Sequence, residues 1–193
     1  MLPIGPLMIE HRLIEKMIGL IQRRADRYAR EGDIDPVFID SVIDFMRTYA
    51  DRCHHGKEEE ILFRELNKKV LPPELKHILD QLVEEHRQGR QTVADLVEAR
   101  QEYARGDREA VRTILDRLRY MTDLYPRHIE KEDGHFFIPC MSLFTQEENE
   151  EMLNEENAFD RELVHQIYRE KISAWSKESD GEEDTRDTRE KGL

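Results

Sequence analysis

The 193-residue chain has only two cysteines, Cys53 and Cys140. This scarcity excludes a disulfide framework and makes a reducing cytosol the expected compartment. No apolar run reaches the length of a membrane span, and the first eight residues lack the charged start of a secretion signal. Glycine and proline number only 9 and 7, and alternating runs of β-branched residues are missing. We therefore predict a cytoplasmic, mostly helical protein.

The chain also has fewer positively charged than negatively charged residues. Lysine and arginine total 30 against 43 acidic residues, which gives a net charge of −13. Nucleic acids and anionic membranes are polyanions, so neither is an expected partner. A nicotinamide or flavin signature is missing as well, so any reductant would come from a redox partner protein. With 38% apolar residues, the chain can bury one domain-sized core.

A pattern of histidine and glutamate occurs twice. Each copy has a Glu-His pair and, about forty residues later, a His and a Glu four positions apart. The copies are Glu10-His11 with His54 and Glu58, and Glu85-His86 with His128 and Glu132. Residues four apart lie on one face of a helix, so each copy can direct imidazoles and a carboxylate at one point. The repeat predicts a cage for two metal ions, with the ligands His11, His54, Glu58, His86, His128 and Glu132.

Imidazole and carboxylate donors without thiolates argue against a structural zinc site and for iron or manganese. The first copy offers two overlapping pairs, because His55 and Glu59 directly follow His54 and Glu58. The apolar face of the surrounding helix places residue 54 nearer the inside and residue 55 towards the outside. The repeat agrees, since it aligns His55 with Ile129. We therefore assign His54 and Glu58 as ligands, with His55 and Glu59 as additional ligands or residues that orient them.

Two further groups of residues adjoin the predicted ligands. Glu10 and Glu85 each precede a ligand and are candidates for orienting imidazoles. Because adjacent helical residues point about 100° apart, we instead predict that both are solvated acids. Phe136 and Phe137 lie at core spacing. We expect them to pack in the core, and we expect some of the chain's aromatic residues to limit the access of water to the metals.

Helix-breaking residues divide the chain into segments. Asp35-Pro36 is an N-cap followed by a first-turn proline, Pro72-Pro73 ends a helix, and Gly106-Asp107 breaks another. The predicted long helices cover about 3–31, 36–71, 74–105 and 108–138. These four helices predict an all-α, four-helix bundle.

A capping box formed by Thr145 and Glu148 predicts a short helix, and a last helix follows to about Trp175. The remaining residues are almost wholly charged or small. We therefore predict a bundle over residues 1–140, a helical extension packed on it over 141–175, and a disordered charged tail over 176–193.

Taken together, these motifs resemble the hemerythrin-like family, also called HHE cation-binding domains. The resemblance covers roughly residues 7–140 and rests on Glu10-His11, the segment 53–63, Glu85-His86 and the segment 128–133. It implies an up-and-down four-helix bundle with a non-heme di-iron centre that is open to dioxygen or nitric oxide. By this resemblance, the terminal imidazole ligands would be His11, His54, His86 and His128, and the bridging carboxylates Glu58 and Glu132.

The chain departs from the oxygen-carrying hemerythrins at two positions. Those proteins place a second histidine four residues after the one on the third helix, but here the residue four after His86 is Arg90. They also use an aspartate that would be Asp133, whereas the repeat favours the preceding glutamate, so Asp133 is a candidate for an additional ligand or an orienting residue. His135, on about the same face as the fourth-helix histidine, is a candidate for the missing imidazole. The four-His, two-Glu set more closely resembles bacterial di-iron proteins linked to the repair of iron–sulfur clusters.

Three classes of function fit this pattern. The first is a binding module whose two iron ions bind dioxygen or nitric oxide for sensing, storage or delivery. The second class is the alternative function. It is a di-iron oxidoreductase, or an iron donor in the repair of oxidatively or nitrosatively damaged iron–sulfur clusters. The third is a metal-stabilised interaction protein. Manganese and zinc are alternatives to iron, and the pattern does not separate a carrier from an enzyme.

Overall fold

A computed structural model describes residues 2–163 of the chain. The chain divides into two compact units, one up to residue 156 and the other from residue 157. The described residues form helices and no strands. None of these helices is both long and apolar enough to cross a membrane. The predicted tail and the end of the predicted extension lie outside the described residues.

The first helix begins and ends, and the second begins, about where the sequence predicts. Helix α1 (Ile4–Glu31) is closed by Gly32, whose φ of 73° favours glycine and whose N–H donates to the Tyr28 carbonyl. Helix α2 (Pro36–Phe45) begins after Asp35, whose side chain accepts hydrogen bonds from two backbone amides of the first turn. The proline in that turn has no N–H to leave unpaired.

The second long helix continues in an unusual form. Two π-helical segments, η1 (Met46–His55) and η2 (Glu58–Phe63), lead into the short helix α3 (Arg64–Leu66). A π-helix bonds each amide to the carbonyl five residues back and is therefore wider than an α-helix. The helix ends at Leu66, so the predicted end near residue 71 is wrong. The amides of residues 68 and 69 bond to carbonyls three residues back, which closes the helix early.

The second half of the bundle starts with α4 (Pro73–Ala104), and Gly106, with a φ of 98°, ends it. Helix α5 (Ala110–Lys131) follows and continues through the π-helical η3 (Glu132–Phe136) into α6 (Phe137–Met141).

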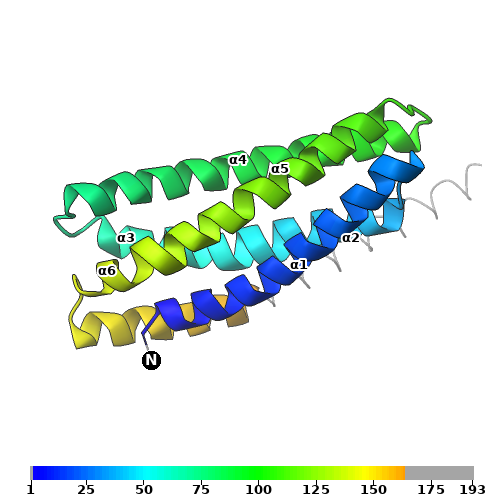
Figure 1. Ribbon diagram of the computed structural model, residues 1–193. Helices are drawn as coiled ribbons and strands as arrows, with labels where there is room; N and C mark the ends of the chain where they lie inside the picture. The colour runs from blue at the N-terminus through cyan, green and yellow to red at the C-terminus, as the bar shows by residue number, and fades with distance from the viewer. Residues whose placement is uncertain (1, 164–193) are drawn as a thin grey trace, which may run out of the picture. The chain divides into compact units, whose positions relative to one another are not determined.

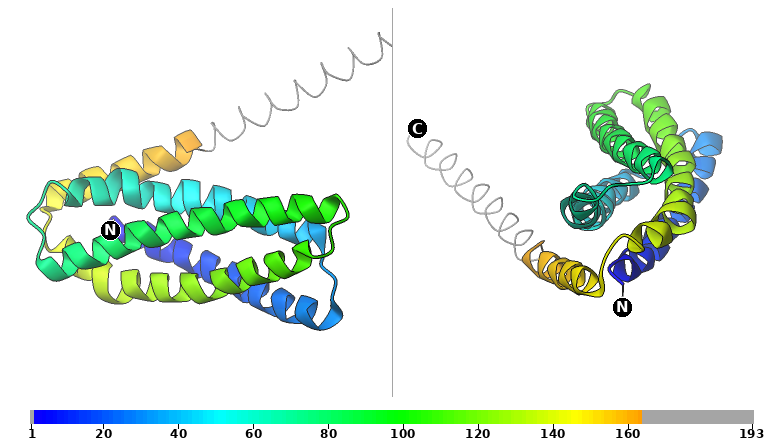
Figure 2. Two further views of the ribbon diagram at one scale, coloured as in Figure 1. Left: turned by 90° about the horizontal axis from the view of Figure 1, so that it is seen from above. Right: turned by 90° about the vertical axis from the view of Figure 1, so that its left-hand side faces the viewer.

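The helices form the predicted up-and-down four-helix bundle. Helix α5 packs against α1 and α4, and η1 packs against α4 and α1. Figure 1 shows the long helices running back and forth side by side, and Figure 2 shows them from above and from one end. An apolar core fills the half of the bundle nearer Gly32. Each buried aliphatic side chain in this core stabilises the fold by about 1.5–3 kcal/mol. Its members include Ile14, Ile21, Ile39, Ala50, Leu96, Ile114 and Leu118.

Residues 146–156 are helical in the same unit, and residues 157–163 are helical in the other unit. The predicted capping box is present: Thr145 N donates to Glu148 Oε2 at 2.9 Å, and Glu148 N donates to Thr145 Oγ1 at 3.2 Å. Arg64 of α3 donates two hydrogen bonds of 2.7 Å to Glu155. This paired contact joins the helix to the end of α3.

Candidate metal centre

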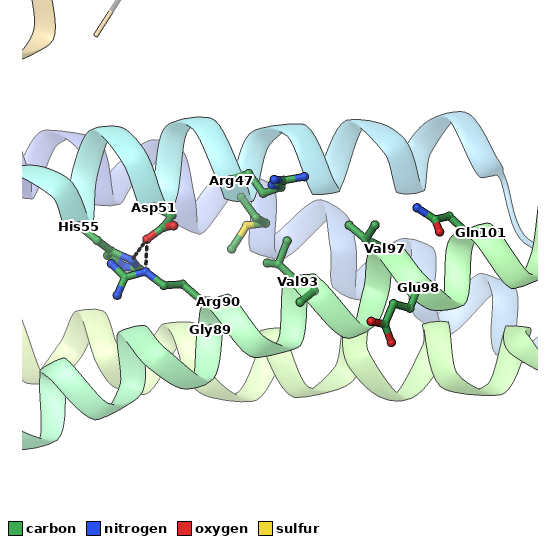
Figure 3. A pocket seen from close by; sticks show the side chains of 11 residues that line it. Arg47, Asp51, His55, Gly89, Arg90, Val93, Val97, Glu98 and Gln101 are labelled. Carbon is green, nitrogen blue, oxygen red and sulfur yellow. Dashed lines mark hydrogen bonds and ion pairs between the residues drawn. The ribbon is translucent and has the colours of Figure 1, made fainter. Parts of the chain in front are cut away.

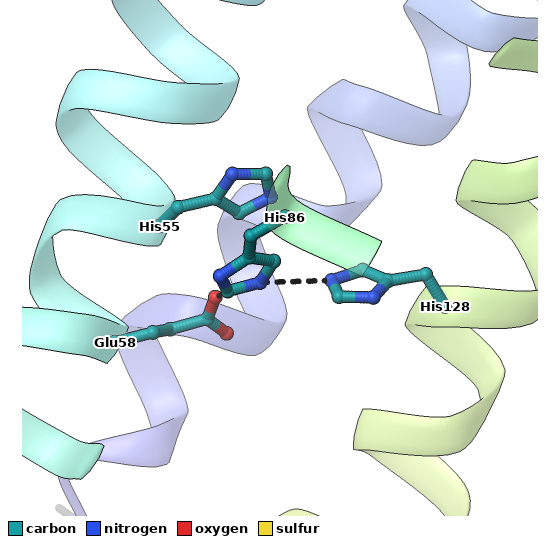
Figure 4. A group of neighbouring side chains, drawn as sticks. All are labelled: His55, Glu58, His86 and His128. Carbon is teal, nitrogen blue, oxygen red and sulfur yellow. Dashed lines mark hydrogen bonds and ion pairs between the residues drawn. The ribbon is translucent and has the colours of Figure 1, made fainter. Parts of the chain in front are cut away.

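Seven buried side chains from all four long helices meet in the half of the bundle away from the apolar core. They form two groups that share Glu58, and the ligand atoms within each group lie within 4.8 Å of one another. The first group is His11, His54, Glu58 and Glu132, and the second is His55, Glu58, His86 and His128. Each of the seven is at most 3% exposed. We call these seven residues the cage, and Figure 4 shows the second group converging on one point.

The two carboxylates stand between the histidines of the two groups. Glu58 faces imidazoles from the second helix and α4, and Glu132 faces imidazoles from α1 and α5. The distances from imidazole Nε2 to carboxylate oxygen are 3.4 Å for His54 and 3.4 Å for His86 to Glu58, and 3.2 Å for His11 and 3.3 Å for His128 to Glu132. Each carboxylate can therefore contact two cations held side by side.

The unpaired polar atoms of the cage test whether it fits metal ions. Both carboxylate oxygens of Glu58 and of Glu132 are buried without a hydrogen bond of good geometry in the described part of the chain. The same holds for Nε2 of His11 and of His54. Burying such groups unpaired costs several kcal/mol. These atoms all face the interior of the cage, which is the arrangement that two cations would satisfy.

A carboxylate anchors four of the five imidazoles from behind. In each case the Nδ1 side bonds to an acid on a neighbouring helical segment, which leaves Nε2 directed into the cage. The pairs are His11 with Asp133 at 2.8 Å, His54 with Glu10 at 3.0 Å, His86 with Glu59 at 2.6 Å, and His128 with Glu85 at 2.9 Å. Glu59 and Asp133, predicted as additional ligands or orienting residues, lie outside the two groups and orient histidines.

The prediction that Glu10 and Glu85 are solvated is wrong. Each acid does point away from the histidine next to it in sequence, but it reaches across to a histidine on the neighbouring helix. A lysine completes each contact: Lys57 pairs with Glu10, and Lys131 Nζ lies 2.5 Å from Glu85. A lysine precedes the cage glutamate in both copies of the repeat, and this signal could have revealed the two networks.

His55 lies inside the cage, contrary to the prediction that it faces outwards. The prediction assumed α-helical spacing, but the segment is the π-helix η1, and the Gly56 amide bonds to the Asp51 carbonyl five residues back. The wider turn brings His54 and His55 to the interior together, at 1% and 3% exposure.

His135 does not supply an additional imidazole. The π-helical segment η3 shifts the register after Glu132, so Phe136 is fully buried and His135 is exposed. The fifth imidazole of the cage is therefore that of His55.

Acidic neighbours raise the pKa values of two cage histidines. Burial opposes the charged form of His11, but Asp133 and Glu132 outweigh it and raise its pKa to about 10. In the same way, Glu58 and Glu59 outweigh burial and raise the pKa of His86 to about 9. Without metal, both imidazoles hold protons at neutral pH, and a metal ion would have to displace them.

Aromatic rings cover the cage, as predicted for some of the chain's aromatic residues. The Phe137 ring stacks on His11 with centroids 5.7 Å apart, and Phe63 stacks on His86 at 5.9 Å. Phe136 meets Phe63 edge to face at 5.8 Å. This apolar cover excludes water and strengthens electrostatic interactions inside.

Comparison with known proteins gives the class of this chain. The Hemerythrin HHE cation binding domain matches residues 2–140, which is most of the chain. The protein belongs to this family, and its cage is a His and Glu site suited to two metal ions. No curated protein and no solved structure gives a significant match.

Proposed function

We propose that the cage holds two iron ions and that the protein reversibly binds dioxygen or nitric oxide for sensing, storage or delivery. His11 and His54 would hold one ion, His55, His86 and His128 the other, with Glu58 and Glu132 shared between them. Bound iron would supply redox-active coordination positions for a small ligand. The seven side chains fix those positions and bury them.

The observation that carries this proposal is the place of His55. With four imidazoles, the predicted ligand set resembles that of di-iron proteins linked to the repair of iron–sulfur clusters, which is the alternative function. The buried fifth imidazole brings the donor set to five imidazoles and two carboxylates. Fewer coordination positions remain open, which favours binding of one small ligand over extensive chemistry. The anchoring acids also support retention of the metal rather than its donation.

The test begins with protein purified anaerobically without added metal. We expect two irons per chain and a charge-transfer absorption band that appears with dioxygen and disappears when the gas is removed. Irreversible oxidation would favour the enzyme or iron-donor alternative instead. No bound transition metal would contradict the proposal.

Two substitutions test the shared carboxylates. Glu58→Ala and Glu132→Ala should each remove at least one metal per chain, because each side chain faces both groups. The neighbouring exposed acids provide matched controls, Glu60→Ala and Glu130→Ala, which should keep both metals. Metal analysis of the folded proteins gives the answer, with Glu58→Gln added if the alanine variant does not fold. Full metal content in both cage variants would contradict the assignment.

A further inference from the structure

His55 differs from the other four cage imidazoles because no carboxylate accepts a hydrogen bond from its Nδ1, which has only the longer contact with Asp51 drawn in Figure 3. Its Nδ1 makes no hydrogen bond with any described residue, although Asp51 Oδ1 lies 3.5 Å away. That oxygen instead accepts a hydrogen bond of 2.7 Å from Arg90 Nε. An imidazole held on one side only can turn out of its place at lower cost than one held on both sides.

The repeat also sets His55 apart. His54 corresponds to His128 and Glu58 to Glu132, but His55 corresponds to Ile129. The repeated part of the cage, with two histidines and one glutamate from each copy, is therefore complete without His55.

A surface groove between η1 and α4 reaches the cage at His55. The groove has a volume of about 570 Å³. Val93 and Val97 line its length, and Asp51 and Arg90 gather beside His55 at one end (Figure 3). Its mixed apolar and polar lining and its size are those of ligand pockets.

Rings stack on the faces of three cage imidazoles. Phe63 lies on His86, Phe137 lies on His11, and His55 itself stands between His86 at 3.8 Å and the buried Tyr125 at 6.4 Å, measured between ring centroids. The gap beside Tyr125 and His128 is too small for a water molecule. The groove is thus the approach to the cage that leads to the imidazole without an anchor.

We propose that His55 is the exchangeable ligand of the centre and that a small metal ligand, such as dioxygen, nitric oxide or azide, reaches the centre through this groove. The inference rests on the proposed function, because it requires metal in the cage. Asp51 and Arg90 stand where the displaced imidazole would turn, and Asp51 can then accept its N–H.

Metal affinity separates an exchangeable ligand from a permanent one. Metal-free protein and two variants, His55→Ala and His128→Ala, are titrated with Fe²⁺ under anaerobic conditions. We expect His55→Ala to bind two ions with less than about a tenfold loss of affinity, and His128→Ala to lose about a hundredfold or more at one position. Equal losses would overturn the inference and leave the proposed function intact. No binding by the unsubstituted protein would overturn both.

The groove itself is tested with azide. In iron-loaded protein, Ala94→Trp places an indole in the groove, whereas Ala104→Trp places one at the exposed end of the same helix. We expect Ala94→Trp to slow azide binding at least about tenfold with unchanged iron content, and Ala104→Trp to have no effect. His55→Ala should accelerate azide binding. Equal azide rates in all the proteins would overturn the inference.

Discussion

Lys57 is a fully buried lysine beside the cage. Its ammonium group pairs with Glu10, which also accepts the hydrogen bond from His54. Burial opposes ionisation of Glu10, but the bonds from His54 and Lys57 outweigh it and lower its pKa. The equivalent Lys131, which pairs with Glu85, is 22% exposed. The two copies of the repeat therefore make the same contacts, but the lysine of the first copy is buried more deeply than that of the second.

This difference in depth predicts unequal costs of substitution. Lys57→Met leaves the Glu10 carboxylate buried without its cation and should lower the free energy of unfolding by about 3–5 kcal/mol. Lys131→Met removes the matching contact where water can replace it, so its cost should be about 1 kcal/mol or less. Urea unfolding of all three proteins in the same metal state measures both values. Equal costs would show that burial of Lys57 does not matter.

At this scale the sequence predicted much of the centre. Spacing and repetition identified six of the seven residues that the structure brings together, namely His11, His54, Glu58, His86, His128 and Glu132. The partners of Glu10 and Glu85 could not be predicted from local spacing, because it does not show which neighbouring helix a side chain faces; the lysine repeated before each cage glutamate was a signal for them.

At the scale of elements, residues that must break or start a helix were reliable guides. Gly32 and Gly106 have positive φ angles that other residues rarely adopt, and Asp35 caps α2 as predicted. The π-helical segments had no local signal, because their wide turns place buried histidines and glutamates that only the assembled bundle brings together. The misplacement of His55 and His135 follows from this one cause.

The cap of α2 gives a prediction at this scale. Asp35→Ala removes the acceptor for two backbone amides and should lower the free energy of unfolding by about 1 kcal/mol. Asp35→Asn keeps a cap and should cost much less. Both variants lose the exposed pair with Arg24, so comparing them isolates the cap. Chemical unfolding measures the difference, and equal stabilities would contradict the capping role.

At the scale of the whole molecule, the cage joins all four long helices, so metal binding is linked to folding. A cation that binds only the native state stabilises it by about 2.7 kcal/mol at a free concentration of one hundred times its Kd. For a chain of this size, that shift corresponds to a rise in Tm of roughly 5–11 °C.

Removing the metal should therefore lower the Tm by at least several degrees, and reloading should restore it. Differential scanning calorimetry before and after dialysis against a chelator measures the shift. The double variant Glu58→Gln/Glu132→Gln is the control, because its Tm should not respond to added metal. A Tm that is insensitive to metal in the unsubstituted protein would contradict the linkage.

The break in the repeat at residue 55, where the second copy has Ile129, also bears on electron transfer. Two irons in this cage would have two and three imidazole neighbours, so their ligand fields would differ. Bound iron would supply one-electron redox chemistry there, and the unequal sets of histidines would give the two metal positions different affinities for an added electron.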